Sequence, residues 1–156
     1  MEIQIQTRLS SKMTPPNNQF WEPALAAAES LLAEFDRPDA EVSVLLVDDP
    51  AIHELNRLWR GYDKPTDVLS WPLEEELPLI SGEDVLGDVV ISLDTAARQA
   101  LARGWSVEEE TALLLVHGIL HLLGHEDESE AGSDTMKQIE KRILGKPLDK
   151  VEAVAG

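Results

Sequence analysis

The segment from His117 to Asp127, HGILHLLGHED, places two histidines four positions apart, followed by a glycine and a short cluster of histidine and acidic residues. Side chains four apart on a helix lie on the same face about one turn (~6 Å) apart, so His117 and His121 can bind one ion together. A single histidine on an apolar helix is more often a buried side chain with a hydrogen bond. Two histidines at this spacing, followed in the sequence by acidic residues, favour a metal site.

The third ligand must come from beyond the helix. The chain has no cysteine, so its metal ligands can only be His, Asp or Glu. On a continuous helix His125 would lie ~12 Å beyond His117 along the axis, too far for two ligands of one ion. The helix is therefore predicted to end at Gly124, and His125, Glu126 and Asp127 are the candidates for the third ligand.

Gly118 bears on the kind of reaction. In the HExxH pattern of zinc metalloproteases, the residue after the first histidine is a glutamate that acts as general base. Here that position is Gly118, so the protease base is absent. The glycine has two interpretations: close packing against another element, or room beside the metal for substrate or backbone.

The elements that would position this site alternate between strands and helices. Alternating or β-branched apolar residues predict strands at residues 2–9, 41–47, 68–71 and 85–93. Helical spacing and capping residues predict helices at residues 20–35, 49–59, 94–103, 106–123 and 134–144, with Asp94 as the cap of the third. Ser106 and Glu109 form a capping box that opens the longest helix.

This mixture predicts an α/β (α+β) fold, a small mixed sheet packed with helices, with the metal site at the C-terminal end of a long helix. The order of the strands stays open. The 156 residues contain no repeat and no linker, so we expect one catalytic domain over residues 1–150 and a frayed tail over residues 151–156.

Charge and hydropathy limit the partners. The net charge of -17 and the pI near 4.4 disfavour non-specific binding to nucleic acid or membranes, so a nucleic-acid site would need a local basic patch. The N-terminus does not resemble a signal peptide, and the longest apolar run, near residues 113–123, is too short to cross a membrane. We expect a cytoplasmic protein that does not bind membranes.

Three blocks of the sequence resemble the YbeY family of bacterial endoribonucleases. They are HGILHLLG at residues 117–124, LNRLWRGYDKPTDVLSWP at 55–72 and LGDVVIS at 86–92, in the family's order and spacing. The resemblance implies a single-domain α/β fold with one zinc ion held by three histidines. It also implies single-strand-specific RNA cleavage in the maturation of small-subunit (16S) ribosomal RNA and in ribosome quality control, with ribosomal proteins as further partners.

The family's site residues carry over in part. His117 and His121 match two of the three ligands, but Asp127 occupies the position of the third histidine, and His125 stands where the family has an aromatic residue. Aspartate also binds zinc, at ~2.0–2.2 Å. We therefore predict a site of His117, His121 and Asp127, with His125 as the alternative third ligand. Arg60 matches the family's functional arginine, whose guanidinium suits a phosphate.

Other residues are weaker candidates. The candidates for a basic groove toward the metal are Arg57, Lys64, Arg98 and Arg103, and the candidates for stacking on bases are Trp59, Tyr62 and Trp71. Asp67 either orders the loop beside the metal or caps a turn, and Asp88 either supports the site or is structural. Two alternative functions stay open: a zinc hydrolase of another substrate such as a peptide, and a non-enzymatic ribosome-associated factor with a degenerate metal site.

Overall fold

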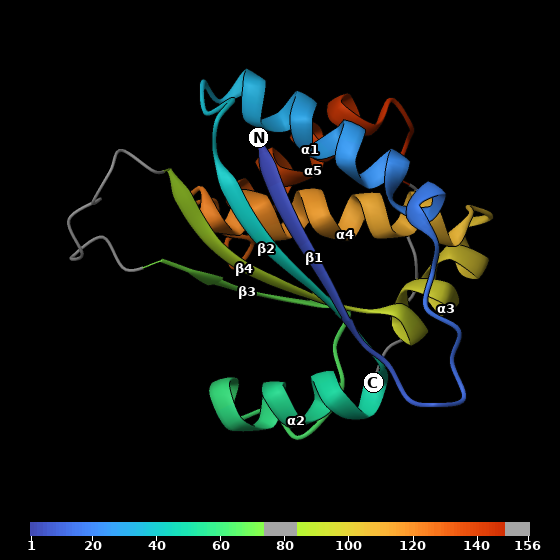
Figure 1. The fold of residues 1–156 in the computed structure, drawn as a ribbon. Helices are drawn as coiled ribbons and strands as arrows, with labels where there is room; N and C mark the ends of the chain where they lie inside the picture. The colour runs from blue at the N-terminus through green and yellow to red at the C-terminus, as the bar shows by residue number, and fades with distance from the viewer. Residues whose placement is uncertain (74–83, 149–156) are drawn as a thin grey trace.

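The computed structural model describes residues 1–73 and 84–148. Its centre is a mixed four-stranded sheet in the order β1-β2-β4-β3 (Figure 1). The strands are β1 (Glu2–Arg8), β2 (Glu41–Val47), β3 (Val68–Pro72) and β4 (Val85–Ser92). Strands β1, β2 and β4 are parallel, and β3 pairs antiparallel with β4 at one edge. The predicted fold class is confirmed, and the strand order is now fixed.

Helices cover both faces of this sheet (Figure 1). One face carries α1, α4 and α5, the opposite face carries α2, and α3 follows directly after β4 at the end of the sheet. Their bounds are α1 (Glu22–Glu34), α2 (Asp49–Arg60), α3 (Leu93–Arg103), α4 (Val107–Leu122) and α5 (Glu130–Leu144), with a 3-10 helix, η1 (Asn18–Trp21), before α1. In the part of the chain that the structure describes, no helix has the length and apolar character to cross a membrane. The predicted tail at residues 151–156 lies outside the described residues.

Two helix starts differ from the sequence prediction. Helix α5 begins at Glu130, not at residue 134, because Ser129 accepts a hydrogen bond from the Gly132 amide and caps it. Helix α3 is capped by Ser92, whose hydroxyl accepts from the Thr95 amide, and not by Asp94. The Asp94 carboxylate instead accepts from the Asp49 amide at the start of α2.

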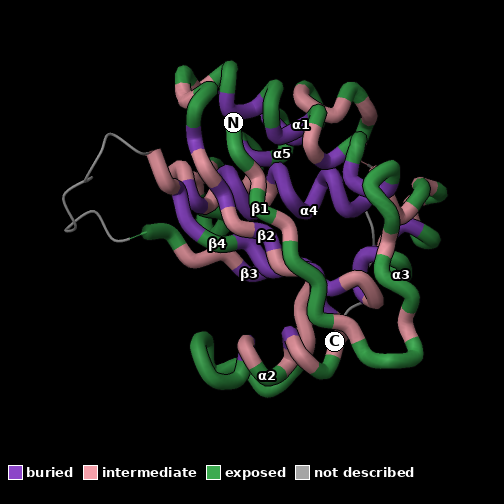
Figure 2. Tube along the Cα trace, viewed as in Figure 1, coloured by how far each residue is buried: buried purple, intermediate pink, exposed green. Residues whose placement is uncertain are grey.

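Helix α4 is the central element of the core. It packs against α1, α3 and α5 and against strands β3 and β4, and nearly its whole length is buried (Figure 2). Its capping box forms as predicted, since Ser106 and Glu109 each accept a hydrogen bond from the other's backbone amide. The predicted end is also confirmed: the helix stops at Leu122, and Gly124 has a φ of 98°, which favours glycine.

Gly118 allows α4 to lie close to the sheet. A Cβ atom added there would be 2.7 Å from Cγ1 of Val89 on β4 and 3.4 Å from Cγ2 of Val68 on β3. The position therefore faces packed valine side chains, which supports the packing interpretation and not the one that leaves room for substrate. The same geometry leaves no space there for a glutamate base.

A buried ion pair joins α3 to the first part of α4. The Glu110 side chain is fully buried, and its Oε2 lies 2.9 Å from Nε of Arg103. Burial disfavours the carboxylate and outweighs the attraction of Arg103, so the pKa of Glu110 rises from 4.5 to about 6. An acid with a raised pKa stabilises the fold at low pH and less so at neutral pH.

We predict that Glu110→Gln removes one component of the pH dependence of stability. The folded protein holds the Glu110 proton more tightly than the unfolded chain, so this contribution is full below pH 4.5 and is lost as pH rises through about 6. That shift is worth about 2 kcal/mol. Urea unfolding of both proteins across this range should therefore show the variant gaining about 2 kcal/mol relative to wild type as pH rises. A difference that stays constant with pH would contradict this assignment.

Candidate metal site

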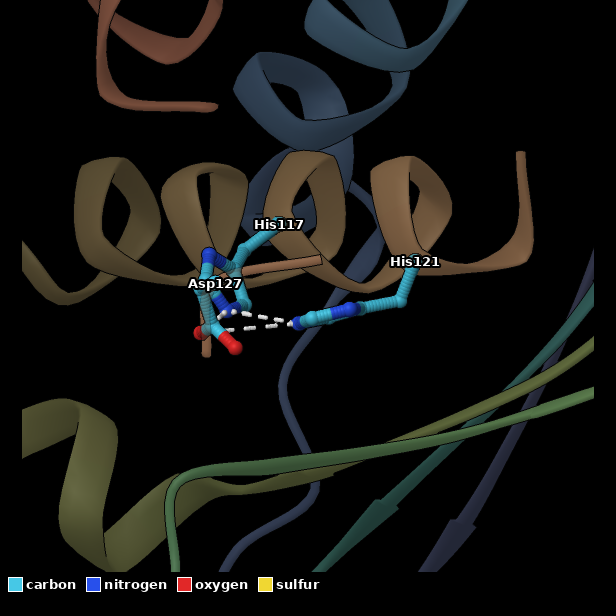
Figure 3. A group of neighbouring side chains, drawn as sticks. All are labelled: His117, His121 and Asp127. Carbon is cyan, nitrogen blue, oxygen red and sulfur yellow. Dashed lines mark hydrogen bonds and ion pairs between the residues drawn. The ribbon is translucent and has the colours of Figure 1, made fainter. Parts of the chain in front are cut away.

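Three predicted side chains converge beside the C-terminal half of α4. His117 and His121 extend from one face of the helix, and Asp127 returns toward them from the segment after Gly124 (Figure 3). The two Nε2 atoms are 3.1 Å apart, and Oδ2 of Asp127 lies 3.3 Å from Nε2 of His117 and 3.7 Å from that of His121. The group is accessible from solvent, since each side chain is partly exposed.

These separations fit a small divalent cation. Two ligand atoms that each lie ~2.0–2.2 Å from a tetrahedral zinc ion are about 3.4 Å from each other. The three observed separations, 3.1, 3.3 and 3.7 Å, bracket that value. The side chains therefore already have nearly the spacing that such an ion requires.

The hydrogen bonds of the two imidazole rings also favour a cation at this position. Nδ1 of His121 lies 3.0 Å from the backbone carbonyl of His125, which can only accept, so Nδ1 is the donor. Nδ1 of His117 lies 2.6 Å from Oε1 of Glu140 and donates in the same way. In their neutral forms both rings then point an Nε2 lone pair toward the other and toward the Asp127 carboxylate. Such a set of converging acceptors suits a cation, either a proton or a metal.

The pKa of His117 reflects the same surroundings. Burial lowers it, but the hydrogen bond and charge of Glu140, with the nearby charges of Asp67 and Asp127, outweigh burial and hold the pKa above its usual value. The ring thus lies in an environment that favours positive charge. A divalent ion on Nε2 would supply that charge without protonation.

A turn stabilised by hydrogen bonds to Glu126 places Asp127 beside the two histidines. The Glu126 carboxylate accepts hydrogen bonds from the Glu128 and Ser129 amides, at 2.7 and 2.9 Å, and from the Ser129 hydroxyl at 2.6 Å. The Ser129 contacts hold the pKa of Glu126 below its usual value. Because its oxygens are used in this turn, Glu126 is not free to bind a metal, and Asp127 is the acid that faces the histidines.

His125 lies apart from the converging group. Its ring packs edge-on against Phe35, with the centroids 5.4 Å apart, and its Nδ1 is buried without a hydrogen-bond partner among the described residues. Its contribution to the site is the backbone carbonyl that accepts from His121. The geometry therefore favours Asp127 over the alternative ligand His125.

The three side chains line an open pocket of about 420 Å³ between α4 and the edge strand β3. Arg60, at the end of α2, reaches the same pocket and makes no ion pair with any residue that the structure describes; its guanidinium lies 5.9 Å from the ring centroid of Tyr62. Val68 and Ser70 of β3 also line it. The predicted arginine and the predicted metal ligands are thus brought together from distant parts of the chain.

Asp67 lines the pocket and also caps a turn, so it fits both roles that the sequence suggested for it. One carboxylate oxygen accepts from its neighbour's amide, that of Val68, at 2.8 Å, and the other lies 3.3 Å from the Gln99 amide nitrogen. Its backbone carbonyl accepts from the Ser92 amide. These contacts join the start of β3 to β4 and α3 and fix one wall of the pocket.

Several weaker candidates lie elsewhere. The proposed basic groove is not assembled from its arginines, because these pair with acids away from the pocket: Arg57 with Glu54, Arg98 with Asp49 and Arg103 with Glu110. Trp59, Trp71 and Asp88 line a different pocket on the α2 side of the sheet. Asp88 therefore does not support the metal site.

Sequence reasoning missed Glu140. This residue of α5 is only 4% exposed and contacts His117 from 23 positions further along the chain. One signal was available: the acid stands within the apolar face of an amphipathic helix, beside Met136 and Ile139, where a buried charge needs a partner.

We predict that Gly132→Ala weakens metal binding without changing any ligand. A Cβ at position 132 would collide with the carboxylate and carbonyl oxygens of Glu126, so the turn that carries Asp127 must move. Zinc affinity, measured by competition with a chelator, should fall. Ala131→Gly is the control: it changes helix propensity at the neighbouring exposed position and should leave the affinity intact. Equal affinities in all three proteins would show that the turn does not set the position of Asp127.

Comparison with known proteins agrees with this architecture. The family model described as "Endoribonuclease YbeY" matches residues 5–147. The endoribonuclease YbeY of Pelotomaculum thermopropionicum is 50% identical over 123 residues, which cover 78% of this chain and 81% of the relative. That of Aquifex aeolicus is 48% identical over 121 residues, covering 76% and 78%. A solution structure from Thermotoga maritima aligns with a TM-score of 0.58 at 30% identity, over 92% of this chain and 89% of that one. The chain belongs to the YbeY family of endoribonucleases.

Proposed function

We propose that this chain is a metal-dependent, single-strand-specific endoribonuclease that uses one zinc ion. The observation that carries this proposal is the convergence of His117, His121 and Asp127 in a pocket that also holds Arg60, which makes no ion pair with a described residue. Family membership supports the reaction class. Following the family resemblance, we further propose that it acts in the cytoplasm on small-subunit (16S) ribosomal RNA, in maturation and ribosome quality control, with ribosomal proteins as partners.

His117, His121 and Asp127 would hold the ion. When bound, a divalent metal supplies a Lewis acid for the phosphoryl group and a means of activating water near neutral pH. The three ligands leave one side of the site open to the pocket, as a catalytic site requires. Zinc suits two imidazoles and one carboxylate better than magnesium, which prefers oxygen ligands.

Arg60 would bind the scissile phosphate. A phosphodiester gains negative charge on its non-bridging oxygens as the phosphorus is attacked, and a guanidinium can donate two parallel hydrogen bonds to them. Arg60 is exposed in the pocket and makes no ion pair with a described residue, so its donors are available to a substrate. Arg57, one turn earlier, is already paired with Glu54.

The acidic lining of the pocket makes phosphate binding depend on the metal. Asp67, Glu126, Asp127 and Glu128 line it together with Arg60. Hydrogen bonds hold the carboxylates of Asp67 and Glu126, whereas the ion pairs of Asp127 with described residues are those with the two histidines. A divalent ion at this position reverses the local charge, which allows a polyanion to approach a protein with a net charge of -17.

The peptide-hydrolase alternative has less support. Its usual base position is Gly118, which packs against Val89 and cannot accommodate a larger side chain without displacing that valine. Cleavage of casein in the absence of cleavage of single-stranded RNA would favour that alternative. Metal binding without either activity would favour a non-enzymatic ribosome-associated factor.

We predict that Arg60→Gln lowers kcat/KM on a single-stranded RNA by about 10²-fold, the typical effect of losing one donor to a developing oxyanion. Zinc content should stay that of the wild type, because Arg60 is not a ligand. Arg57→Gln is the matched control on the same helix and should retain wild-type activity. Equal losses in the two variants, or none in Arg60→Gln, would contradict the assigned role. His117→Ala should lose both metal and activity.

We also predict that Asp127→Asn weakens zinc binding by more than ~100-fold, the upper effect of residues that only support a ligand. The amide keeps the shape of the side chain but loses the charge that a ligand provides. Glu128→Gln removes a neighbouring acid from the same pocket and serves as control, with affinity near wild type. Asp127→His should restore binding. If Asp127→Asn and Glu128→Gln bind zinc equally well, Asp127 is not a ligand.

A further inference from the structure

We propose that Glu140 is a positioning residue for the metal site, which holds His117 in the one orientation and tautomer that binds an ion. The inference rests on the proposed metal site. Its basis is a single contact: Oε1 of Glu140, on α5, lies 2.6 Å from Nδ1 of His117, on α4. The residue is 4% exposed, so its side chain is almost completely removed from solvent.

The position of Glu140 in its helix shows that its charge is buried among apolar side chains, which is unfavourable for folding. Its neighbours on the buried face of α5 are Met136 and Ile139, which belong to the hydrophobic core. An acid among them is unfavourable unless it is paired and hydrogen-bonded. An apolar residue would satisfy packing alone, so the charged side chain indicates a role toward His117.

That role follows from the chemistry of the imidazole. A carboxylate accepts but does not donate, so Nδ1 of His117 must carry the proton. In the neutral ring Nε2 then has a lone pair, and it points at Nε2 of His121 and Oδ2 of Asp127, at 3.1 and 3.3 Å. The opposite tautomer would place a proton where the ion must bind. Glu140 excludes that tautomer and also prevents rotation of the ring.

His121 is held by a different device. Its Nδ1 donates to the backbone carbonyl of His125, which is neutral. Glu140 adds a full negative charge behind His117, and this charge makes the ring a stronger donor to a metal. Together Asp127 and Glu140 carry two negative charges, which a divalent ion balances. The arrangement thus favours a divalent ion over a monovalent one.

The experiment compares zinc affinity, by chelator competition at mildly alkaline pH, in wild type, Glu140→Gln, Glu140→Ala and Glu110→Gln. Glu140→Gln keeps the volume and an acceptor oxygen but loses the charge, and we expect about a 10-fold loss of affinity. Glu140→Ala loses the acceptor as well, and we expect about a 100-fold loss. Glu110→Gln removes the other buried glutamate among the described residues, which lies on α4, and should bind as wild type.

Nitrogen NMR of the metal-free proteins at the same pH gives a second readout. His117 should carry its proton on Nδ1 in wild type and should lose that preference in Glu140→Ala, while His121 keeps it. Wild-type zinc affinity in both Glu140 variants overturns the proposal, and so does an unchanged His117 tautomer in Glu140→Ala. Lower stability with unchanged affinity of the folded protein would also overturn it, because that is what a structural ion pair predicts.

These readouts separate this inference from the proposed reaction. A wild-type protein that binds zinc but cleaves no RNA contradicts the proposed function, and the affinities of the variants still decide the role of Glu140. A wild-type protein that binds no zinc overturns both.

Discussion

The structure depends on a conflict within helix α4, which must be buried on nearly every side and still carry two imidazoles to a pocket. Burial comes from α1, α3 and α5 and from strands β3 and β4. Gly118 makes the closest part of this packing possible, because any side chain there would press on Val89. With Gly118 against the sheet, His117 and His121 emerge at the margin of β3, where the core ends and solvent begins.

The acidic residues at the site differ in the contacts that their carboxylates make. The carboxylates of Asp67 and Glu126 accept hydrogen bonds from nearby amides and hydroxyls and are thereby structural. Glu140 is turned away from solvent onto the back of His117. Asp127 is left facing the histidines, and it completes a set of acceptors that suits a cation. The ability of the site to bind an ion therefore comes from the acceptor groups that are not used in the hydrogen bonds holding the fold.

The charge of the protein gives this arrangement a further consequence. A chain with a net charge of -17 repels nucleic acid unless a local positive site exists. Arg57, Arg98 and Arg103 do not create one at the pocket, since each is neutralised by an acid elsewhere. Arg60 is positioned to do so, and a bound divalent ion would add to it. Substrate attraction and catalysis would then be concentrated at one point rather than spread along a basic groove.

The sequence by itself determined what depends on near neighbours. The capping box at Ser106, the stop at Gly124 and the helical spacing of His117 and His121 follow from hydrogen bonds and periodicity within one or two turns. The resemblance to a known family pointed to Arg60 and to the position of Asp127. Even local reasoning failed where two capping residues competed, as at Ser92 and Asp94.

Tertiary structure alone decided the strand order, the edge position of β3, the arrival of Arg60 from the opposite side of the sheet and the contact of Glu140 with His117. The reason is physical. These features join residues far apart in the chain, and the burial that selects them is shared among many side chains at once. The spacing of residues within a single segment therefore does not predict these long-range contacts.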